Sequence, residues 1–197
     1  MLHREHPSKP LELLGLRNDD VDAIAVRVVN DFYREVEGRP DGAGGTCYPG
    51  FMTWETHNLL GKGTGATADG RRAGAAVSDS VGAVQGMDRK GLTALLRSVT
   101  KIDYLPSVGG VTFNIKLSPE FFEGDGMLAR LEAAIRTYFE AGGFQLQVNV
   151  VSREMLEEAR VNPEAHRNLI VRVGGFSAYF VELDAGIQEE IIARTMH

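Results

Sequence analysis

Few side chains in this 197-residue sequence are of a type and spacing that could do chemistry. Its one cysteine, Cys47, could act as a nucleophile, but no histidine in the sequence is committed to it. A lone cysteine is more often a small packing residue. His57 and Asp69, with Arg71 and Arg72, form a polar patch that could bind an anion. A solvated loop is the more common explanation for such charges, so neither group predicts a reaction.

Two glycine-rich strings resemble nucleotide-binding patterns. Residues 63–68 match Gly-x-Gly-x-x-Ala, with Asp88 20 residues further on. A dinucleotide fingerprint requires a strand before the glycines and a helix that opens at them. Turn-forming residues 69–74 follow instead. Residues 61–64 resemble a phosphate loop, but the position five before Gly61 is Thr56, not glycine. We therefore reject both nucleotide sites.

A third glycine-rich string, Arg172-Val173-Gly174-Gly175-Phe176, lies near the C-terminus. An apolar run precedes it at 169–171 and another follows at 179–181. Two glycines between strand-like segments normally form a tight turn, because glycine adopts backbone angles that other residues avoid. A turn is the simplest interpretation of the pair taken by itself.

Hydrophobic spacing and end signals predict the elements that must position this glycine pair. Asp19 or Asp20 can cap a helix that runs to about Glu37. Its expected core face holds Val21, Ile24, Ala25, Val28, Val29, Phe32 and Val36. Further helices are expected at 93–102, at 127–141, after a Ser152 cap to 161 and after an Asp184 cap to 194, with a helical turn from Asn162. Strands are expected at 48–57, 111–117, 144–151 and 168–173.

The predicted order alternates strands with helices, which favours an α/β fold. Glycine is abundant, at 23 residues, and indicates many irregular turns. The segment 58–90 is expected to be a long irregular stretch with few apolar anchors. Loops of that length inside a compact domain are usually functional or disordered. Its small residues suit a segment packed against another structure.

Composition excludes several classes of protein. The net charge of −6 argues against a nucleic-acid surface, because no basic excess can neutralise phosphates. No apolar run approaches the roughly 18 to 20 residues that span a bilayer. A single cysteine excludes an internal disulfide framework and a cysteine-based zinc or iron–sulfur site. The first residues lack the apolar core of a signal peptide, so we expect a cytoplasmic protein without membrane partners.

Several motifs in a fixed order resemble those of the pyruvate formate-lyase-like glycyl radical enzymes. They are Tyr48-Pro49-Gly50-Phe51-x-Thr53-Trp54-x-x-His57, Gly65-Ala66-Thr67-x-Asp69-Gly70-Arg71-Arg72-Ala73-Gly74, Gln85-Gly86-x-Asp88, Gly91-x-Thr93-Ala94, Ser98-Val99-x-Lys101, Gln147-Val148-Asn149-Val150 and Arg172-Val173-x-Gly175-Phe176. The resemblance covers nearly all the chain from about residue 18. It implies the C-terminal part of a ten-stranded α/β barrel, with the glycine loop inserted into its centre.

The resemblance assigns roles to the glycine string. Gly175 would carry a stored radical, whereas Arg172, Val173, Gly174 and Phe176 would serve motif packing and recognition by an activating enzyme. A glycine Cα radical is stabilised jointly by its amide nitrogen and carbonyl, and a side chain would twist the planar centre. Radicals react with oxygen, so the loop is expected to be buried. We expect residues 1–75, with a loose leader at 1–18, to end a barrel domain and residues 76–197 to form a glycine-radical domain.

The resemblance also implies partners. A separate iron–sulfur, S-adenosylmethionine-dependent activase would remove the glycine hydrogen, so no cofactor or metal is expected in this chain itself. The stored radical would generate a thiyl on an active-site cysteine of a loop that this sequence lacks. Cys47 precedes Tyr48-Pro49-Gly50, which is the wrong motif context, and it is not given that role.

The missing cysteine leaves several interpretations open. The chain would be a fragment, a truncated reading frame or a split subunit of a radical lyase or acyltransferase such as formate acetyltransferase. Alternatively, it is a non-catalytic repair or interaction module that docks on a partner lyase. A third alternative is an unrelated α/β binding protein in which the glycine pair is only a turn. Family members act on substrates from pyruvate and diols to aryl acetates, and the sequence does not choose among them.

Overall fold

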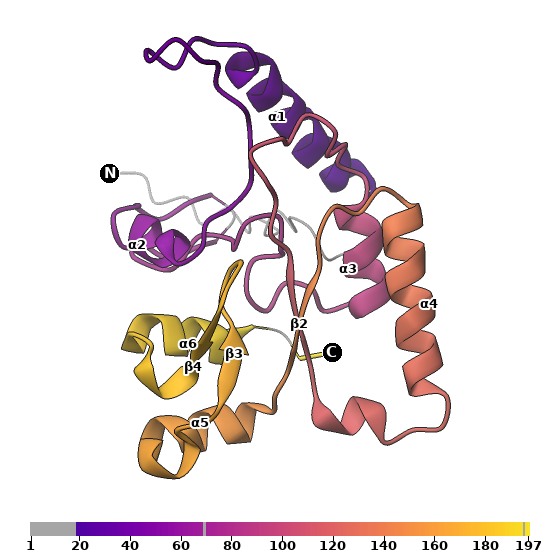
Figure 1. Ribbon diagram of the computed structural model, residues 1–197, viewed down its shortest axis with the longest axis vertical. Coiled ribbons are helices and arrows are strands. Elements are labelled where there is room, and N and C mark those ends of the chain that lie inside the picture. The colour runs from indigo at the N-terminus through magenta and orange to yellow at the C-terminus, as the bar shows by residue number, and fades with distance from the viewer. Residues whose placement is uncertain (1–18, 69, 195) are drawn as a thin grey trace, which may run out of the picture.

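The computed structural model describes residues 19–68, 70–194 and 196–197, which form helices around two small sheets (Figure 1). The helices are α1 (Asp19–Val36), α2 (Thr56–Lys62), α3 (Leu92–Val99), α4 (Met127–Glu140), α5 (Arg153–Val161) and α6 (Ala185–Ala193). The strands are β1 (Asn114–Leu117), β2 (Gln147–Val150), β3 (Ile170–Arg172) and β4 (Ser177–Tyr179). Short 3₁₀ turns occupy Pro119–Phe122, Pro163–His166 and Phe180–Glu182.

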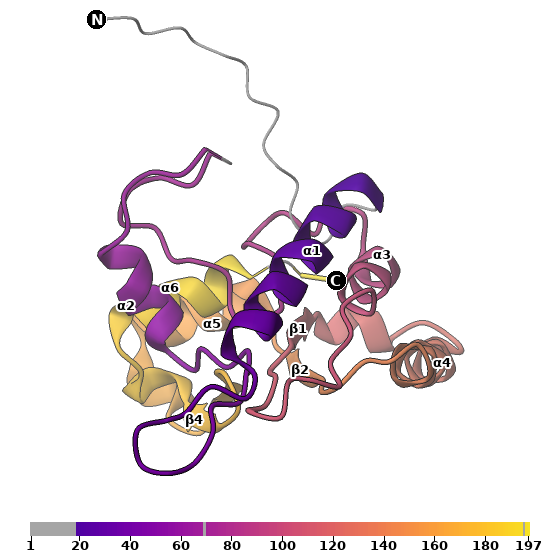
Figure 2. The same ribbon diagram turned by 90° about the horizontal axis from the view of Figure 1, so that it is seen from above.

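The two sheets differ in direction. Strands β1 and β2 are parallel, with Asn114 opposite Gln147 and Lys116 opposite Asn149. Helix α4 makes the crossover between them, as parallel neighbours require. Strands β3 and β4 form an antiparallel hairpin. The parallel pair runs between α3 and α4 on one side and α5, α6 and the hairpin on the other, as Figures 1 and 2 show from two directions.

Each side of the parallel pair has its own apolar core. The first core packs α3, α4 and β1, and its most buried members are Val99, Phe113 and Leu117. The second core packs α5, α6 and the hairpin, and its most buried members are Leu156, Val173, Phe180 and Ile191. The glycine string therefore lies beside the second core, which Val173 enters, next to the parallel pair.

Most of the predicted elements are confirmed, together with their end signals. The Ser152 side chain accepts a hydrogen bond from the Met155 amide at 3.0 Å and caps α5. Asp184 accepts one from the Gly186 amide at 2.8 Å and caps α6. The helical turn after Asn162 is also present. Such caps satisfy amides that the first helical turn leaves without a partner.

The predicted strand at 48–57 is wrong. Only Phe51 forms a bridge there, in parallel with Val111, and Trp54 has a positive φ of 49° that breaks an extended strand. Helix α2 then begins at Thr56, inside the predicted strand, and runs to Lys62, inside the segment from 58 expected to be irregular. A mixed run of apolar residues indicates burial, but it does not separate a strand from a turn followed by a helix.

The predicted core face of α1 is only partly confirmed, although its bounds are confirmed: Val29 packs against the first core, but three other members of that face are exposed. Ile24, Val28 and Phe32 are 39%, 61% and 39% exposed. The helix instead buries Asp22 and Tyr33. The Asp22 carboxylate accepts a hydrogen bond from Lys101 at 2.6 Å, so its partner allows a charged residue to replace apolar ones in the contact.

Two predictions lie outside the described residues: the leader at 1–18, and Asp69 of the polar patch. Within the parts of the chain that the structure describes, no helix is long and apolar enough to cross a bilayer.

Candidate functional site

The glycine pair forms the tip of the β3–β4 hairpin. Arg172 is opposite Ser177 in the strand register, and the Val173 amide donates a hydrogen bond to the Phe176 carbonyl at 3.0 Å. Gly174 and Gly175 are therefore the two central residues of a tight turn. The turn expected from the sequence is confirmed.

The two glycines are required for different reasons. Gly174 is buried, and a Cβ built on it would lie 2.8 Å from the Trp54 carbonyl oxygen, which leaves no room for a side chain. A Cβ on Gly175 would meet nothing nearer than the Trp54 Nε1 at 3.5 Å, an ordinary contact. Its φ of +98° is nevertheless a conformation that residues with side chains rarely adopt. Space excludes a side chain at Gly174, and backbone conformation disfavours one at Gly175.

Gly175 is exposed in this structure, so the predicted burial of the loop is wrong for this chain. The apolar flanks enter the second core, but the tip itself extends beyond it. Because Gly175 is exposed and a Cβ built on it would have no neighbour nearer than 3.5 Å, the residue is accessible from outside the chain.

Side chains, rather than a neighbouring strand, hold the hairpin against the parallel pair. The Asn149 side chain accepts a hydrogen bond from the Arg172 amide at 2.6 Å and donates one to the Arg172 carbonyl at 2.8 Å. The Val173 carbonyl accepts from Asn114 at 3.1 Å. The Gly175 amide donates to the Gln147 Oε1 at 3.3 Å. Every polar bond of this set is directional, so together they fix the hairpin backbone in one position.

A buried guanidinium adds to the same contact. Arg194, at the end of α6, donates to the Val173 carbonyl at 2.9 Å and to the Arg172 carbonyl at 3.3 Å. The Arg194 Nε lies 2.9 Å from the Glu190 Oε1, and the Arg194 Nη2 lies 3.4 Å from the Asp79 Oδ2. Both carboxylates therefore balance the buried positive charge that binds the hairpin.

The charge cluster shifts the protonation of its members. Burial by itself would raise the pKa of Glu190, but the charge of Arg194 and the nearby His57 outweigh burial and lower this pKa to about 2. Burial would lower the pKa of His57, but the Glu190 carboxylate, 3.5 Å away, raises it above the ordinary 6.5. Glu190 therefore stays ionised as the counterion of Arg194.

Lys116 on β1 is buried beside this cluster. Its Nζ donates to the carbonyls of Ile191 and Ile192 at 3.2 and 3.0 Å, which the end of α6 leaves without helical partners. Burial first, and then the positive charge of Arg194, lower the pKa of Lys116 to about 8. Lys116 thus ties the end of α6 to the parallel pair.

The chain is similar to known proteins in sequence and in structure. Comparison with protein families matches residues 77–181, more than half of the chain, to the family described as glycine radical. The chain belongs to the glycyl radical family. The trans-4-hydroxy-L-proline dehydratase of Clostridioides difficile is 35% identical over 181 residues, which are 92% of this chain and 23% of that protein. The 4-hydroxyphenylacetate decarboxylase glycyl radical subunit of C. difficile strain 630 is 42% identical over 149 residues, 75% of this chain and 16% of that subunit.

Solved structures agree with the family assignment. The glycerol-bound, B12-independent glycerol dehydratase of Clostridium butyricum superimposes with a TM-score of 0.89 at 40% identity, over 93% of this chain and 23% of that one. The chain spans less than a quarter of the length of these relatives. It corresponds to the C-terminal part of glycyl radical enzymes and of their α/β barrel, which confirms the predicted family and fold class.

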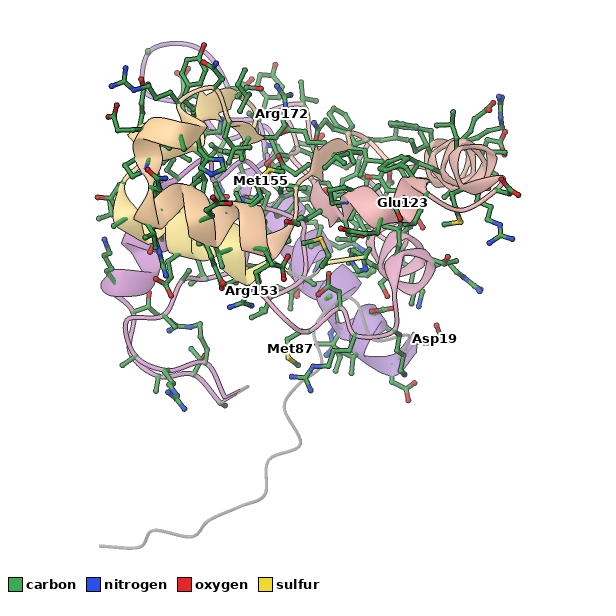
Figure 3. The ribbon with its side chains drawn as sticks, turned by 90° about the horizontal axis from the view of Figure 1, so that it is seen from below. Asp19, Met87, Glu123, Arg153, Met155 and Arg172 are labelled. Atoms are coloured by element: carbon green, nitrogen blue, oxygen red, sulfur yellow. The ribbon has the colours of Figure 1, made fainter. Side chains whose placement is uncertain are left out.

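The other glycyl-motif residues divide between core and surface. Val173 is fully buried in the second core, whereas Phe176 is 37% exposed. The Arg172 side chain donates to the Ser177 Oγ at 3.0 Å across the hairpin, and Figure 3 shows Arg172 well separated from Arg153 of α5. Arg172 and Phe176 are therefore the motif side chains that the structure leaves accessible beside Gly175.

Two residues of the polar patch that was considered for anion binding, His57 and Arg71, have partners within the chain. His57 is fully buried beside Glu190, whereas the Arg71 guanidinium donates to loop carbonyls, including that of Ala75 at 2.5 Å. Cys47 lies in the loop after α1, with its Sγ 3.9 Å from the Pro40 carbonyl. Among the described residues, no three His, Cys, Asp or Glu side chains are grouped to hold a metal ion.

The side chains that hold the hairpin were not predicted to contact it, although one pattern in the sequence indicated them. Asn114 and Lys116 alternate with apolar residues in β1, and Gln147 and Asn149 do the same in β2. Residues at a spacing of two share one face of a strand. Polar residues on one face of buried strands indicate a bonded partner, here the hairpin. Arg194 gave no comparable signal.

Proposed function

We propose that this chain is the radical-bearing portion of a glycyl radical enzyme and stores the radical on the Cα of Gly175. A separate iron–sulfur, S-adenosylmethionine-dependent activase removes one hydrogen atom from that carbon. The stored radical then generates a thiyl at a catalytic cysteine outside this sequence. In this proposal residues 1–75 complete the barrel domain and residues 76–197 form the glycine-radical domain.

The conformation and accessibility of Gly175 carry this proposal. The residue stands at a hairpin tip with a fixed amide, a φ of +98° and a Cα that an outside reactant can approach. A planar Cα radical needs a residue without a side chain, so that the amide nitrogen and the carbonyl on either side can share the unpaired electron. Gly174 is a poor alternative, because the Trp54 backbone covers it.

Exposed apolar side chains support a large partner surface for this chain. Leu105 and Val108 are 88% and 68% exposed, and Ile24, Val28 and Phe32 form a stripe along α1. Apolar groups gathered on a surface mark protein contacts. We propose that the cysteine-bearing portion of the enzyme covers these surfaces and the tip of the hairpin, which shields the radical from water and oxygen.

The remaining motif residues take supporting roles in this proposal. Val173 and Gly174 anchor the tip in the second core, since both are buried. Arg172 and Phe176 are accessible beside Gly175, which supports recognition of the tip by the activase. Cys47 has no part in the reaction.

Electron paramagnetic resonance of the anaerobically activated chain tests the proposal. We expect a doublet, because one hydrogen remains on the radical carbon, and we expect Gly175→Ala to abolish it completely. Gly142→Ala is the matched control: Gly142 has a φ of +96° and no neighbour within 4 Å of an added Cβ, so it imposes the same backbone strain elsewhere. No doublet in the wild-type chain, with or without a cysteine-bearing partner, would falsify the proposal.

The same experiment separates the split enzyme from a repair module. Addition of a cysteine-bearing portion from a relative should give turnover if this chain is part of a split or divided lyase. Turnover that appears only with a partner whose own radical glycine is damaged would favour the repair module.

A further inference from the structure

Strand β2 presents two amide side chains to the glycine hairpin from the same face. Gln147 and Asn149 are two residues apart, so their side chains point the same way. They are 5% and 4% exposed. Burial removes competing water, which makes each of their hydrogen bonds a stronger constraint on the hairpin.

The two amides bind different parts of the hairpin. The Asn149 side chain forms hydrogen bonds with both backbone groups of Arg172, at 2.6 and 2.8 Å. It makes the two bonds that the backbone of a neighbouring strand would otherwise make. Gln147 reaches further along the turn, and its Oε1 accepts the hydrogen bond of the Gly175 amide at 3.3 Å. Asn149 thus positions the strand that leads to the tip, whereas Gln147 bonds the tip residue itself.

We propose that Gln147 is the positioning residue of the Gly175 radical. This inference rests on the proposed function and deepens it. The peptide plane before Gly175 must stay coplanar with the radical centre for the nitrogen to share the unpaired electron. An acceptor on the N–H holds that plane in place and increases electron donation by the nitrogen. The other near neighbours of the Gly175 Cα are the Trp54 ring and the Thr112 methyl group, at 3.5 and 3.7 Å from a built Cβ.

The side chain at 147 can be changed with little change of shape. Gln147→Met keeps the length of the side chain and removes the acceptor, whereas Gln147→Glu keeps an acceptor oxygen. Gln145→Met is the matched control, because the Gln145 Oε1 also accepts a backbone hydrogen bond, from the Phe113 amide at 2.8 Å, but away from the hairpin. Loss of an amide that accepts a backbone hydrogen bond is thereby separated from loss of the bond to Gly175.

Hydrogen exchange of the ¹⁵N-glycine-labelled full chain tests the bond before any radical is made. We expect the Gly175 amide to exchange about fivefold faster in Gln147→Met, the effect of one ordinary hydrogen bond. The wild-type rate should persist in Gln145→Met and in Gln147→Glu. An unchanged rate in Gln147→Met overturns the proposal.

Electron paramagnetic resonance after anaerobic incubation with an activase then tests the electronic role. With less donation from nitrogen, more spin stays on the Cα, so Gln147→Met should widen the doublet splitting, while Gln145→Met leaves the wild-type splitting. A wild-type doublet that Gln147→Met does not alter overturns the role of Gln147 alone. A wild-type chain with no doublet overturns the proposed function, and the two failures are therefore distinguishable.

Discussion

The two apolar cores and the polar layer between them stabilise this chain in different ways. Each core is built from aliphatic and aromatic side chains that gain from burial and have few directional demands. The layer between them is polar, and most of its members are also buried. It comprises Asp79, Asn114, Lys116, Gln147, Asn149, Glu190 and Arg194. The glycine hairpin contacts both, with its flanks in the second core and its backbone bonded to the polar layer.

The polar layer, rather than the two cores, positions the hairpin tip. Apolar packing tolerates small shifts, because its free energy depends mainly on the area buried. A buried amide or guanidinium has a large desolvation cost unless its partners lie at bonding distance and angle. The polar layer therefore specifies where residues 172–175 lie, whereas the cores supply most of the free energy of folding.

Replacement of Arg194, the cation at the centre of the polar layer, should disrupt this layer and have the largest effect on stability. Arg194→Met leaves the Glu190 and Asp79 carboxylates buried without their shared cation and removes two bonds to the hairpin. We expect the free energy of unfolding to fall by about 3 to 5 kcal/mol, which urea denaturation can measure. We also expect a lower radical yield, because the backbone before Gly175 loses its anchor.

Arg194→Lys is the control for charge, since it keeps the cation but not the planar fork of donors. It should recover part of the lost stability. A loss below about 1 kcal/mol in Arg194→Met would mean that apolar packing alone holds the hairpin, and the contrast between core and polar layer would be wrong.

The elements around both cores could be predicted because their signals are local. Apolar residues at helical spacing predicted α4, and the Ser152 and Asp184 caps predicted the starts of α5 and α6. The glycine turn could be predicted equally well, since a glycine pair between two apolar runs usually forms a turn. In each of these cases, neighbours within a few residues determine the structure.

The pairing of groups within the polar layer could not be predicted, because the bonded partners are distant in sequence. The bond between Asn149 and Arg172 spans 23 residues, and the one between Gln85 and Glu190 spans 105. Part of the α1 face was mispredicted for the same reason: the buried Asp22 carboxylate is bound by Lys101 and Ser98, which are distant in sequence. The strand predicted at 48–57 failed because Trp54 adopts a positive φ beside Gly174, which no local pattern indicates.

A smaller effect should appear in the dependence of stability on pH. The pKa of Lys116 is about 8 in the folded chain and near 10.5 when unfolded. Between these values the unfolded chain binds more protons, so a rise in pH favours the folded state. Below pH 8 both states are protonated and this contribution no longer changes. Because the buried Lys116 loses its charge in the folded chain, the free energy of unfolding should rise by about 3 kcal/mol across this window.

Comparison with Lys116→Met isolates this contribution. Tyr104 and Tyr138 have raised pKa values, so their effect runs the other way above pH 10, and the useful comparison is between pH 7.5 and 9.5. The difference in urea midpoint between wild type and variant should grow in favour of wild type over that range. A constant difference would show that Lys116 stays charged in the folded chain.

Loss of an exposed ion pair should have the smallest effect on stability, unlike loss of the buried Arg194 in the polar layer. Arg136 and Glu132 lie one turn apart on α4, 3.1 Å between charged atoms, with 67% and 69% of their side chains exposed. Water screens this pair, so Arg136→Gln should lower the free energy of unfolding by at most about 0.5 kcal/mol, and less in high salt. Arg194 has the same spacing from Glu190, four residues along a helix, but only 9% of its side chain is exposed. If Arg136→Gln and Arg194→Met lowered the free energy of unfolding in urea equally, burial would not explain the contribution of the polar layer to stability.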